Sequence, residues 1–224
     1  MGIAQENQMQ LGLDFGIWVE PEMVSVNSRL YEKHPDWAAA VPGRNHSEGR
    51  NQRILDLANP QVQEFVIEEM SRVFSGADIS YVKWDMNRIF SDDYSPYLPP
   101  DRQGEAAHRY ICGLYHCMDV LTKRFPDILF EGCAAGGNRF DLGILCYFPQ
   151  IWQAIIQMRS AARRFRTITL TAIRRPCLVH TFQQARITRH CAARRLKHAL
   201  PWRLSGIWVM NVISVICPKK NLRR

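Results

Sequence analysis

The distribution of acidic residues constrains this chain more than any other feature of its sequence. All 21 Asp and Glu residues lie in residues 1–152 with 13 Lys and Arg, so that segment has a net charge of −8. Residues 153–224 contain 16 Lys and Arg and no acid, which gives a net charge of +16. Average composition would place about 10 acidic residues in a segment of that length. The two segments therefore have to be interpreted separately.

Residues 1–152 show alternating strand and helix patterns. Short apolar or β-branched runs bounded by turn residues predict strands at 13–19, 53–58, 79–85 and 127–133. Asn59 and Pro60 predict the start of a helix after the second strand, and Gly104 to Phe125 is a second helical pattern that ends at Pro126. This alternation predicts an α/β fold of parallel βαβ units. Four strands make about half of a (β/α)8 barrel, which needs ~250 residues, or else an open sheet.

The segment YVKWDMNR contains candidate catalytic side chains at the end of the third expected strand. Alternation puts Lys83 and Asp85 on one face of the strand and Trp84 on the other. Asp85 falls at the carboxyl end, where barrel enzymes hold their catalytic groups. A neighbouring lysine favours the ionised carboxylate, which suits a nucleophile or a charge stabiliser. The alternative is a structural ion pair at the end of a strand.

Other strand ends carry further candidates. In FGIWVEPEMV, Trp18 lies close to Glu20 and Glu22, an arrangement that suits either a platform for a sugar ring or a buried core tryptophan. Cys133 ends the fourth strand and precedes small residues that let a ligand approach the backbone, or that simply form a turn. Arg50 offers a forked donor for hydroxyls or carboxylates.

Cysteine usage and the apolar stretches bear on metal binding and location. The seven cysteines form no repeated close pair, and no Cys or His set completes a zinc motif, so we expect reduced thiols and no metal. Residues 1–10 lack the basic and apolar regions of a signal peptide. The most apolar stretch, 204–217, is shorter than the ~18 residues that a membrane span needs. These features predict a cytoplasmic protein without a membrane contact.

In order along the chain, FGIWVEPEMVS, HPDW, SEGRNQ, YVKWDMNR, DILFEGCAAGGNRFD and PQIW resemble the retaining α-galactosidases of glycoside hydrolase family 36. The resemblance covers about residues 11–152. It implies a partial (β/α)8 TIM barrel, about strands 2 to 5, within residues 1–152. It also implies hydrolysis of terminal α-linked galactose in oligosaccharides such as melibiose and raffinose, without a metal or organic cofactor. Intact members of the family are often homotetramers.

The resemblance assigns roles position by position. Asp85 matches the nucleophile that forms the glycosyl-enzyme, and Lys83 matches the residue that reaches the galactose hydroxyls. Ala135 stands where the family usually has Gly, a departure that crowds the subsite. The positions that match the substrate-binding segments of the family are Trp18, Arg50, Lys83, Trp84, Met86, Asn87 and Cys133.

One part of the expected chemistry is missing from the sequence. A retaining enzyme needs a second carboxylate roughly 5–5.5 Å from the first, to protonate the leaving oxygen and then to deprotonate water. In the family this group is an Asp three residues after the tryptophan of PQIW. Here that position is Ile155, and no acid follows it anywhere in the chain. The sequence therefore predicts an inactive member of the family.

The genetic code offers an explanation for residues 153–224. Codons can be chosen for 153–160 such that one nucleotide restored after the Trp152 codon gives Thr-Ser-Asp-Asn-Thr-Asp-Ala-Ile, which contains the expected acid. The same frame offset applied to 178–190 gives a sequence that resembles the family's next strand. We therefore expect 153–224 to be a frameshifted, basic tail without a defined domain. One alternative is a nucleic-acid-binding protein that uses this tail, and another is a sugar-binding remnant.

Overall fold

The computed structural model describes residues 14–135, 138–152, 178–179 and 209–215. In chain order the elements are β1 (Asp14–Val19), β2 (Met23–Ser25), α2 (Arg29–Lys33), η1 (Pro35–Trp37), β3 (Gln52–Ile54), α3 (Pro60–Ser75), β4 (Tyr81–Asp85), η2 (Pro100–Glu105), α4 (Ala106–Arg124), β5 (Leu129–Cys133), η3 (Ile144–Cys146), β6 (Gln150–Trp152), β7 (Leu178–Val179) and β8 (Val209–Val215).

A six-stranded sheet organises the described residues. Its strand order is β7-β6-β5-β4-β1-β8, and β8 runs antiparallel to β1 while the other neighbours are parallel. The segment between β1 and β4 contains β2, α2, β3 and then α3, which leads into β4, and α4 leads from β4 to β5. The predicted parallel α/β arrangement is confirmed. All carboxyl ends of the parallel strands therefore meet at one edge of the sheet.

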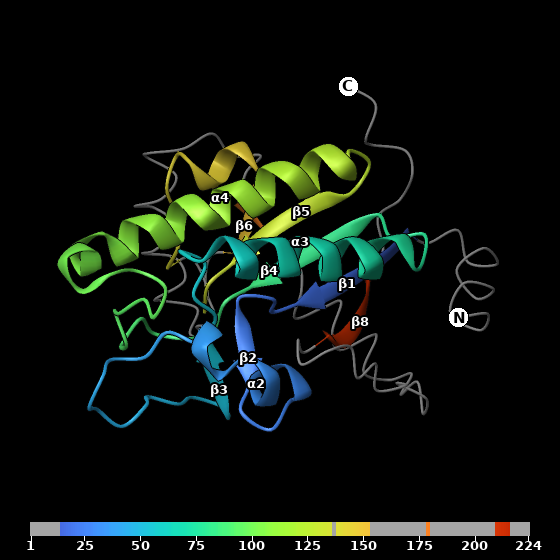
Figure 1. Cartoon of the computed structure of the whole chain (residues 1–224). Coiled ribbons are helices and arrows are strands. Elements are labelled where there is room, and N and C mark those ends of the chain that lie inside the picture. Colours follow the sequence, from blue (N-terminus) through green and yellow to red (C-terminus); the bar gives the residue numbers. More distant parts are fainter. Residues whose placement is uncertain (1–13, 136–137, 153–177, 180–208, 216–224) are drawn as a thin grey trace, which may run out of the picture.

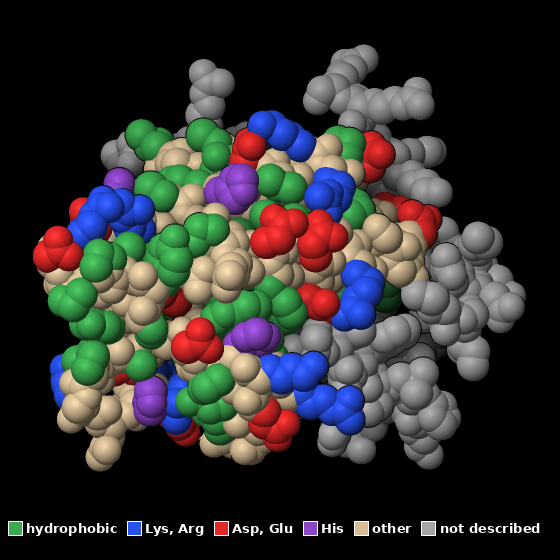
Figure 2. Space-filling model, in the orientation of Figure 1, with side chains coloured by type: hydrophobic (Ala, Val, Ile, Leu, Met, Phe, Trp, Pro, Cys, Tyr) green, Lys and Arg blue, Asp and Glu red, His purple; other side chains and the backbone are tan. Residues whose placement is uncertain are grey.

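The helices α3 and α4 lie side by side over one face of this sheet (Figure 1). Each strand alternates, so every second side chain points toward the helices, and these side chains are apolar and buried. They join the inward faces of α3 and α4 in one core, whose contribution from the sheet is Ile17, Val19, Val82, Trp84, Phe130 and Ile151. The outward faces of the helices carry interspersed acidic and basic side chains (Figure 2).

Both predicted helices form, and their ends follow from identifiable signals. The Asn59 side chain accepts a hydrogen bond from the Gln61 backbone N at 2.9 Å, so it caps α3 as its position before Pro60 predicts. The helix α4 ends at Arg124, two residues before Pro126. Because a residue that precedes proline is disfavoured in helical conformation, Phe125 is the last position available as a cap.

One predicted strand is wrong in its pairing. We expected 53–58 to be a strand of the parallel sheet, but β3 covers only 52–54 and pairs with β2 in a separate antiparallel sheet. The chain turns at Asp56, which accepts from the Ala58 backbone N at 3.1 Å and from Ser95 Oγ. As a result β1 pairs directly with β4, and β6 supplies the fourth parallel strand.

The segment 153–224 falls largely outside the described residues. Two of its strands are described, and they lie at the two ends of the sheet: β7 beside β6, and β8 beside β1 (Figure 1). The division of the chain at residue 152 therefore stays a prediction.

A close backbone approach between α4 and the loop before α3 gives a test of this fold. A Cβ on Gly113 would lie 2.0 Å from the Leu57 carbonyl oxygen and 2.7 Å from Gln63 Nε2. We expect Gly113→Ala to lower the free energy of unfolding by about 1–3 kcal/mol, as overpacking does, despite the better helix propensity of alanine. Urea denaturation measures the difference.

Gly104→Ala is the matched control, because a Cβ at Gly104 meets nothing within 4 Å. We expect it to change stability by no more than about 0.5 kcal/mol. Equal stabilities of the two variants would contradict the packing of α4 against Leu57.

Candidate active site

The face of the sheet opposite α3 and α4 is polar at the carboxyl ends of the strands. In the register of the sheet, Lys83 lies between Trp18 and Glu131. Two residues further along the strands, Asp85 lies beside Cys133. Because side chains two residues apart share a face, all five project to the same side. The structure thus brings together four residues that the sequence predicted, and it adds Glu131 to them.

Asp85 is the centre of this group. It is 5% exposed, and its two carboxylate oxygens accept three hydrogen bonds. Oδ2 accepts from Trp18 Nε1 at 3.0 Å and from Asn87 Nδ2 at 2.8 Å, while Oδ1 accepts from the Met86 backbone N at 2.9 Å. All three donors are N–H groups, so together they fix the orientation of the Asp85 carboxyl group. The sequence anticipated all four residues.

Lys83 is held between a carboxylate and an aromatic ring. Its Nζ lies 3.5 Å from Glu131 Oε1 and 3.6 Å from the centroid of the Trp152 ring. Burial raises the pKa of Glu131, against the opposing effect of the Lys83 charge. Glu131 is not among the site residues expected from the sequence, although its position two residues before Cys133 is the signal that places it on this face.

Glu20 brings a third buried carboxylate to the same edge. It is 1% exposed, and its Oε1 accepts from Arg50 Nη1 at 3.0 Å and also from Asn87 Nδ2. Burial raises the pKa of Glu20, although the hydrogen bond from Asn87 and the charge of Arg50 act in the opposite direction. The predicted residues Arg50 and Asn87 therefore meet at Glu20, next to Asp85.

Trp84 is not brought to this face. It is fully buried among the residues under the helices, and its Nε1 donates to Glu22 Oε1 at 2.7 Å. Glu22 also accepts from Tyr110 at 2.6 Å and pairs with Arg139 at 2.7 Å. The strand alternation that directs Asp85 to the polar face directs Trp84 away from it. Glu22 thus belongs to a structural network and not to the Asp85 group.

The small residues after β5 adopt a special conformation. Ala135 has a φ of 48°, in the left-handed region where glycine is free of strain. The resemblance places a Gly at this position in the family, and the backbone here shows why a residue without Cβ suits it.

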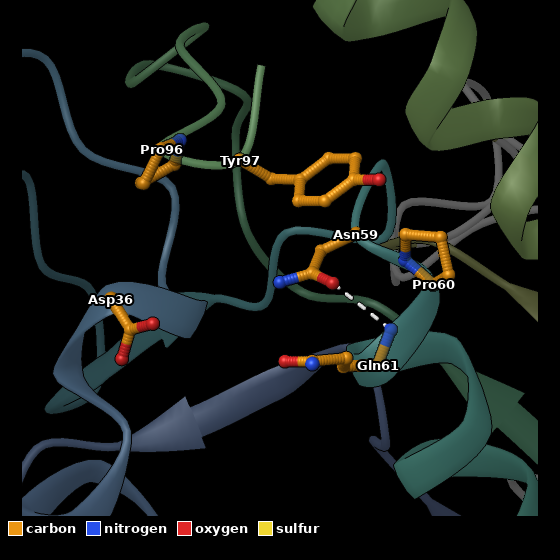
Figure 3. Close-up of a pocket in the computed structure, with 6 residues that line it drawn as sticks. All are labelled: Asp36, Asn59, Pro60, Gln61, Pro96 and Tyr97. Carbon is orange, nitrogen blue, oxygen red and sulfur yellow. Dashed lines mark hydrogen bonds between the residues drawn. The ribbon is translucent and has the colours of Figure 1, made fainter. Parts of the chain in front are cut away.

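A hollow of about 450 Å³ lies elsewhere, at the start of α3 (Figure 3). It is lined by Asp36, Asn59, Pro60, Gln61, Pro96 and Tyr97, none of which belongs to the Asp85 group. Asn59 is engaged there as the cap of α3, as the dashed line in Figure 3 shows. This hollow therefore offers no arrangement of catalytic groups comparable to that at Asp85.

The described part of the chain shows neither a metal site nor a membrane-spanning helix. Among these residues, no group of three or more His, Cys, Asp and Glu side chains is placed to hold a metal ion. Within the same residues, no helix has the length and apolar character needed to cross a membrane.

Comparison with known proteins gives a consistent result. The profile of the melibiase family matches residues 2–180. The chain is 59% identical over 143 residues to alpha-galactosidase AgaA of Geobacillus stearothermophilus, covering 64% of this chain and 20% of that protein. It is 51% identical over 141 residues to alpha-galactosidase Mel36A of Lactobacillus acidophilus, covering 63% and 19%. The chain thus spans about a fifth of the length of these relatives.

Solved structures agree with this. An AgaA variant of G. stearothermophilus in complex with raffinose matches with a TM-score of 0.75 at 49% identity, covering 78% of this chain and 24% of that one. The alpha-galactosidase of Lactobacillus brevis matches with a TM-score of 0.69 at 42% identity, covering 75% and 22%. Both relatives are glycoside hydrolases by their names.

The raised pKa of Glu131 predicts a pH-dependent contribution to stability. Because the pKa of folded Glu131 is raised, an unfolded glutamate loses its proton first as pH rises above about 4.3, so stability falls until the folded Glu131 has lost its proton as well. Glu131→Gln removes that slope. We therefore expect the stability of the variant relative to the parent to increase as pH rises above about 4, as measured by urea denaturation.

Glu105→Gln is a control with the opposite sign. Arg102 and Arg109 lower the pKa of Glu105 to about 2, so its contribution is present above the unfolded pKa and is lost as pH falls toward 2. We expect this exposed variant to show a small difference, confined to acid pH and weakened by salt. A stability of Glu131→Gln that runs parallel to the parent at all pH values would contradict the burial of an ionisable Glu131.

Proposed function

The chain belongs to the melibiase family, and on that premise we propose that its polar strand ends are part of a retaining α-galactosidase site in which Asp85 is the nucleophile. The observation that carries the proposal is the environment of Asp85. Its carboxylate lies at the carboxyl end of β4 and is oriented by Trp18, Asn87 and the Met86 backbone N. The same residues match the family motifs.

The fold fits this assignment as a portion of a (β/α)8 barrel. Parallel strands with helices over one face leave the other face to become the barrel interior. On that face Asp85 would attack the anomeric carbon of galactose, and the bond to the leaving oxygen would break as the new bond forms. Lys83, fixed by Glu131 and Trp152, would hold the sugar hydroxyls. Trp18, Arg50, Asn87 and Cys133 complete the proposed subsite.

The proposed substrates are α-galactosides such as melibiose and raffinose. The resemblance implies them, and the AgaA variant that matches this chain was crystallised with raffinose. No metal or organic cofactor is required in this proposal, because a carboxylate nucleophile and a proton donor suffice for the chemistry.

We propose further that this chain supplies the nucleophile of that chemistry but not its acid and base. The acid that protonates the leaving group would come from the position of Ile155, which has no ionisable side chain. In natural galactosides the leaving group is a sugar hydroxyl, which departs poorly unless it is protonated. Hydrolysis of these substrates would therefore be lost.

The remaining alternatives differ in support. The matched family and the named relatives lend no support to a nucleic-acid-binding protein that uses residues 153–224. A cytoplasmic location stays a prediction based on cysteine usage, and Cys112, Cys117 and Cys146 are free thiols in the described part of the chain. Homotetramer formation is implied only by the resemblance.

A galactosyl donor whose leaving group needs no protonation separates the two halves of the reaction. With α-galactosyl fluoride, fluoride departs with its bonding electrons as Asp85 attacks, so we expect the full-length chain to gain one galactosyl group at Asp85, located by peptide mass spectrometry. We expect no turnover of a phenyl α-galactoside, because departure of its phenol requires the missing acid.

Asp85→Asn should abolish the labelling, whereas Asp93→Asn, at an exposed position in the following loop, should not. Labelling of a different residue in the folded chain would contradict the assignment of Asp85. Phenyl galactoside hydrolysis that Asp85→Asn abolishes would show instead that the chain does possess an acid.

The frameshift hypothesis has a direct test in the gene. We expect resequencing of the DNA around the Trp152 codon to find one additional nucleotide, after which the reading frame continues as Thr-Ser-Asp. The acid-free composition of residues 153–224 supports this hypothesis. A confirmed DNA sequence that encodes the chain as it stands would exclude an error in the sequence determination, and the absence of the family's acid segment from every frame would exclude a deletion.

A further inference from the structure

We propose that Glu20 is a positioning residue of this site: its buried carboxylate fixes both the turn that carries Arg50 and the amide that holds Asp85. The inference rests on the proposed function, since it takes Asp85 as the nucleophile. Glu20 itself is not expected to contact the reacting atoms.

The Asn87 amide links Glu20 to Asp85 by hydrogen bonds. An amide nitrogen has two hydrogens, and in Asn87 both are used: Nδ2 donates to Asp85 Oδ2 at 2.8 Å and to Glu20 Oε1. One nitrogen therefore bridges the two carboxylates. If Glu20 were absent, the Asn87 amide would lose one of its two anchors, and its orientation toward Asp85 would no longer be determined.

The second argument is the conformation of Arg50. The Gly49 and Gln52 backbones exchange hydrogen bonds of 3.3 and 3.0 Å, and the two residues between them, Arg50 and Asn51, have φ values of 59° and 58°. This is the geometry of a type I′ turn, which glycine and asparagine favour and which is strained for arginine. Such strain persists where the surroundings fix the conformation.

Glu20 provides that constraint. Arg50 is half exposed, so packing does little to hold it, and it forms an ion pair of 3.0 Å with the fully buried Glu20. A bond between an exposed guanidinium and a buried carboxylate anchors the outer group to the rigid inner one. Arg50 is thereby held over the same edge of the sheet as Asp85.

The third argument is the unfavourable environment of Glu20. Its Oε2 is buried and makes no hydrogen bond among the described residues, and Asp85 is a second negative charge close by, while Gln52 is a neighbouring side chain that favours the charge of Glu20. A neutral or apolar side chain would avoid both penalties. The charge of Glu20 is therefore explained by the Arg50 and Asn87 side chains that it holds, and not by stability alone.

The test compares Glu20→Gln with Glu48→Gln in the full-length chain. Glu48 lies on the same loop as Arg50 but pairs with Arg53, on the exposed side. Two-dimensional ¹H–¹⁵N NMR observes the Asn87 side-chain amide and the Trp18 indole directly, without any need for activity. We expect Glu20→Gln to shift both signals and Glu48→Gln to shift neither.

A second measurement links this to the site. We expect Glu20→Gln to slow labelling of Asp85 by α-galactosyl fluoride at least 10-fold, since misplacement by about 1 Å costs up to about 10²-fold, while Glu48→Gln labels at the parent rate. Under conditions where both variants are fully folded, a merely structural role would leave the rate unchanged. Unchanged Asn87 and Trp18 signals in Glu20→Gln would overturn the proposal.

The two proposals can fail separately. If the parent chain is not labelled at all, the proposed function fails, yet the NMR signals still decide whether Glu20 fixes Asn87. If Glu20→Gln does not fold, Arg50→Ala removes the half-exposed partner only. It is expected to shift the Asn87 amide through Glu20, and the absence of such a shift would refute the coupling.

Discussion

The burial of three carboxylates on one edge of a sheet is the constraint on which the rest of this structure depends. Glu20, Asp85 and Glu131 are each at most 5% exposed, and buried like charges are tolerated only when donors and cations surround them. Lys83 lies against Glu131, Arg50 pairs with Glu20, and three neutral donors surround Asp85. Polar groups that would otherwise be free to move are thereby fixed in mutual orientation, which is what a binding or catalytic site requires.

The two faces of β4 show how packing and chemistry are joined. Trp84 is locked under the helices by van der Waals contact and by its hydrogen bond to Glu22, which Tyr110 from α4 also contacts. Because Trp84 stands between Lys83 and Asp85 in the strand, its fixed position determines where those two side chains emerge on the opposite face. The apolar core thus sets the geometry of the polar edge.

Sequence reasoning reached the parts of the fold that local signals specify. Asn59 and Pro60 mark the start of α3 by the chemistry of a helix cap, and the alternation in YVKWDMNR places Asp85 correctly. It did not reach the partners of strands, because pairing depends on contacts between distant segments: residues 53–58 have a strand-like composition, but β3 pairs with β2. It also missed Glu131, whose role follows only from the register that sets it beside Lys83.

The catalytic groups of the family lie at the ends of separate strands, which explains how a chain can contain the nucleophile and lack the acid. In barrel enzymes the acting residues come from the ends of several strands, and here the nucleophile candidate ends β4 while the family's acid would follow β6. The side chains of the two strands meet, since the Trp152 ring lies against Lys83. A change of reading frame immediately after Trp152 would therefore keep every residue that donates to Asp85 and replace all of 153–224, including the position of the acid that protonates the leaving oxygen. Loss of the acid raises the barrier to departure of the leaving group, and a leaving group that is stable without a proton avoids that barrier.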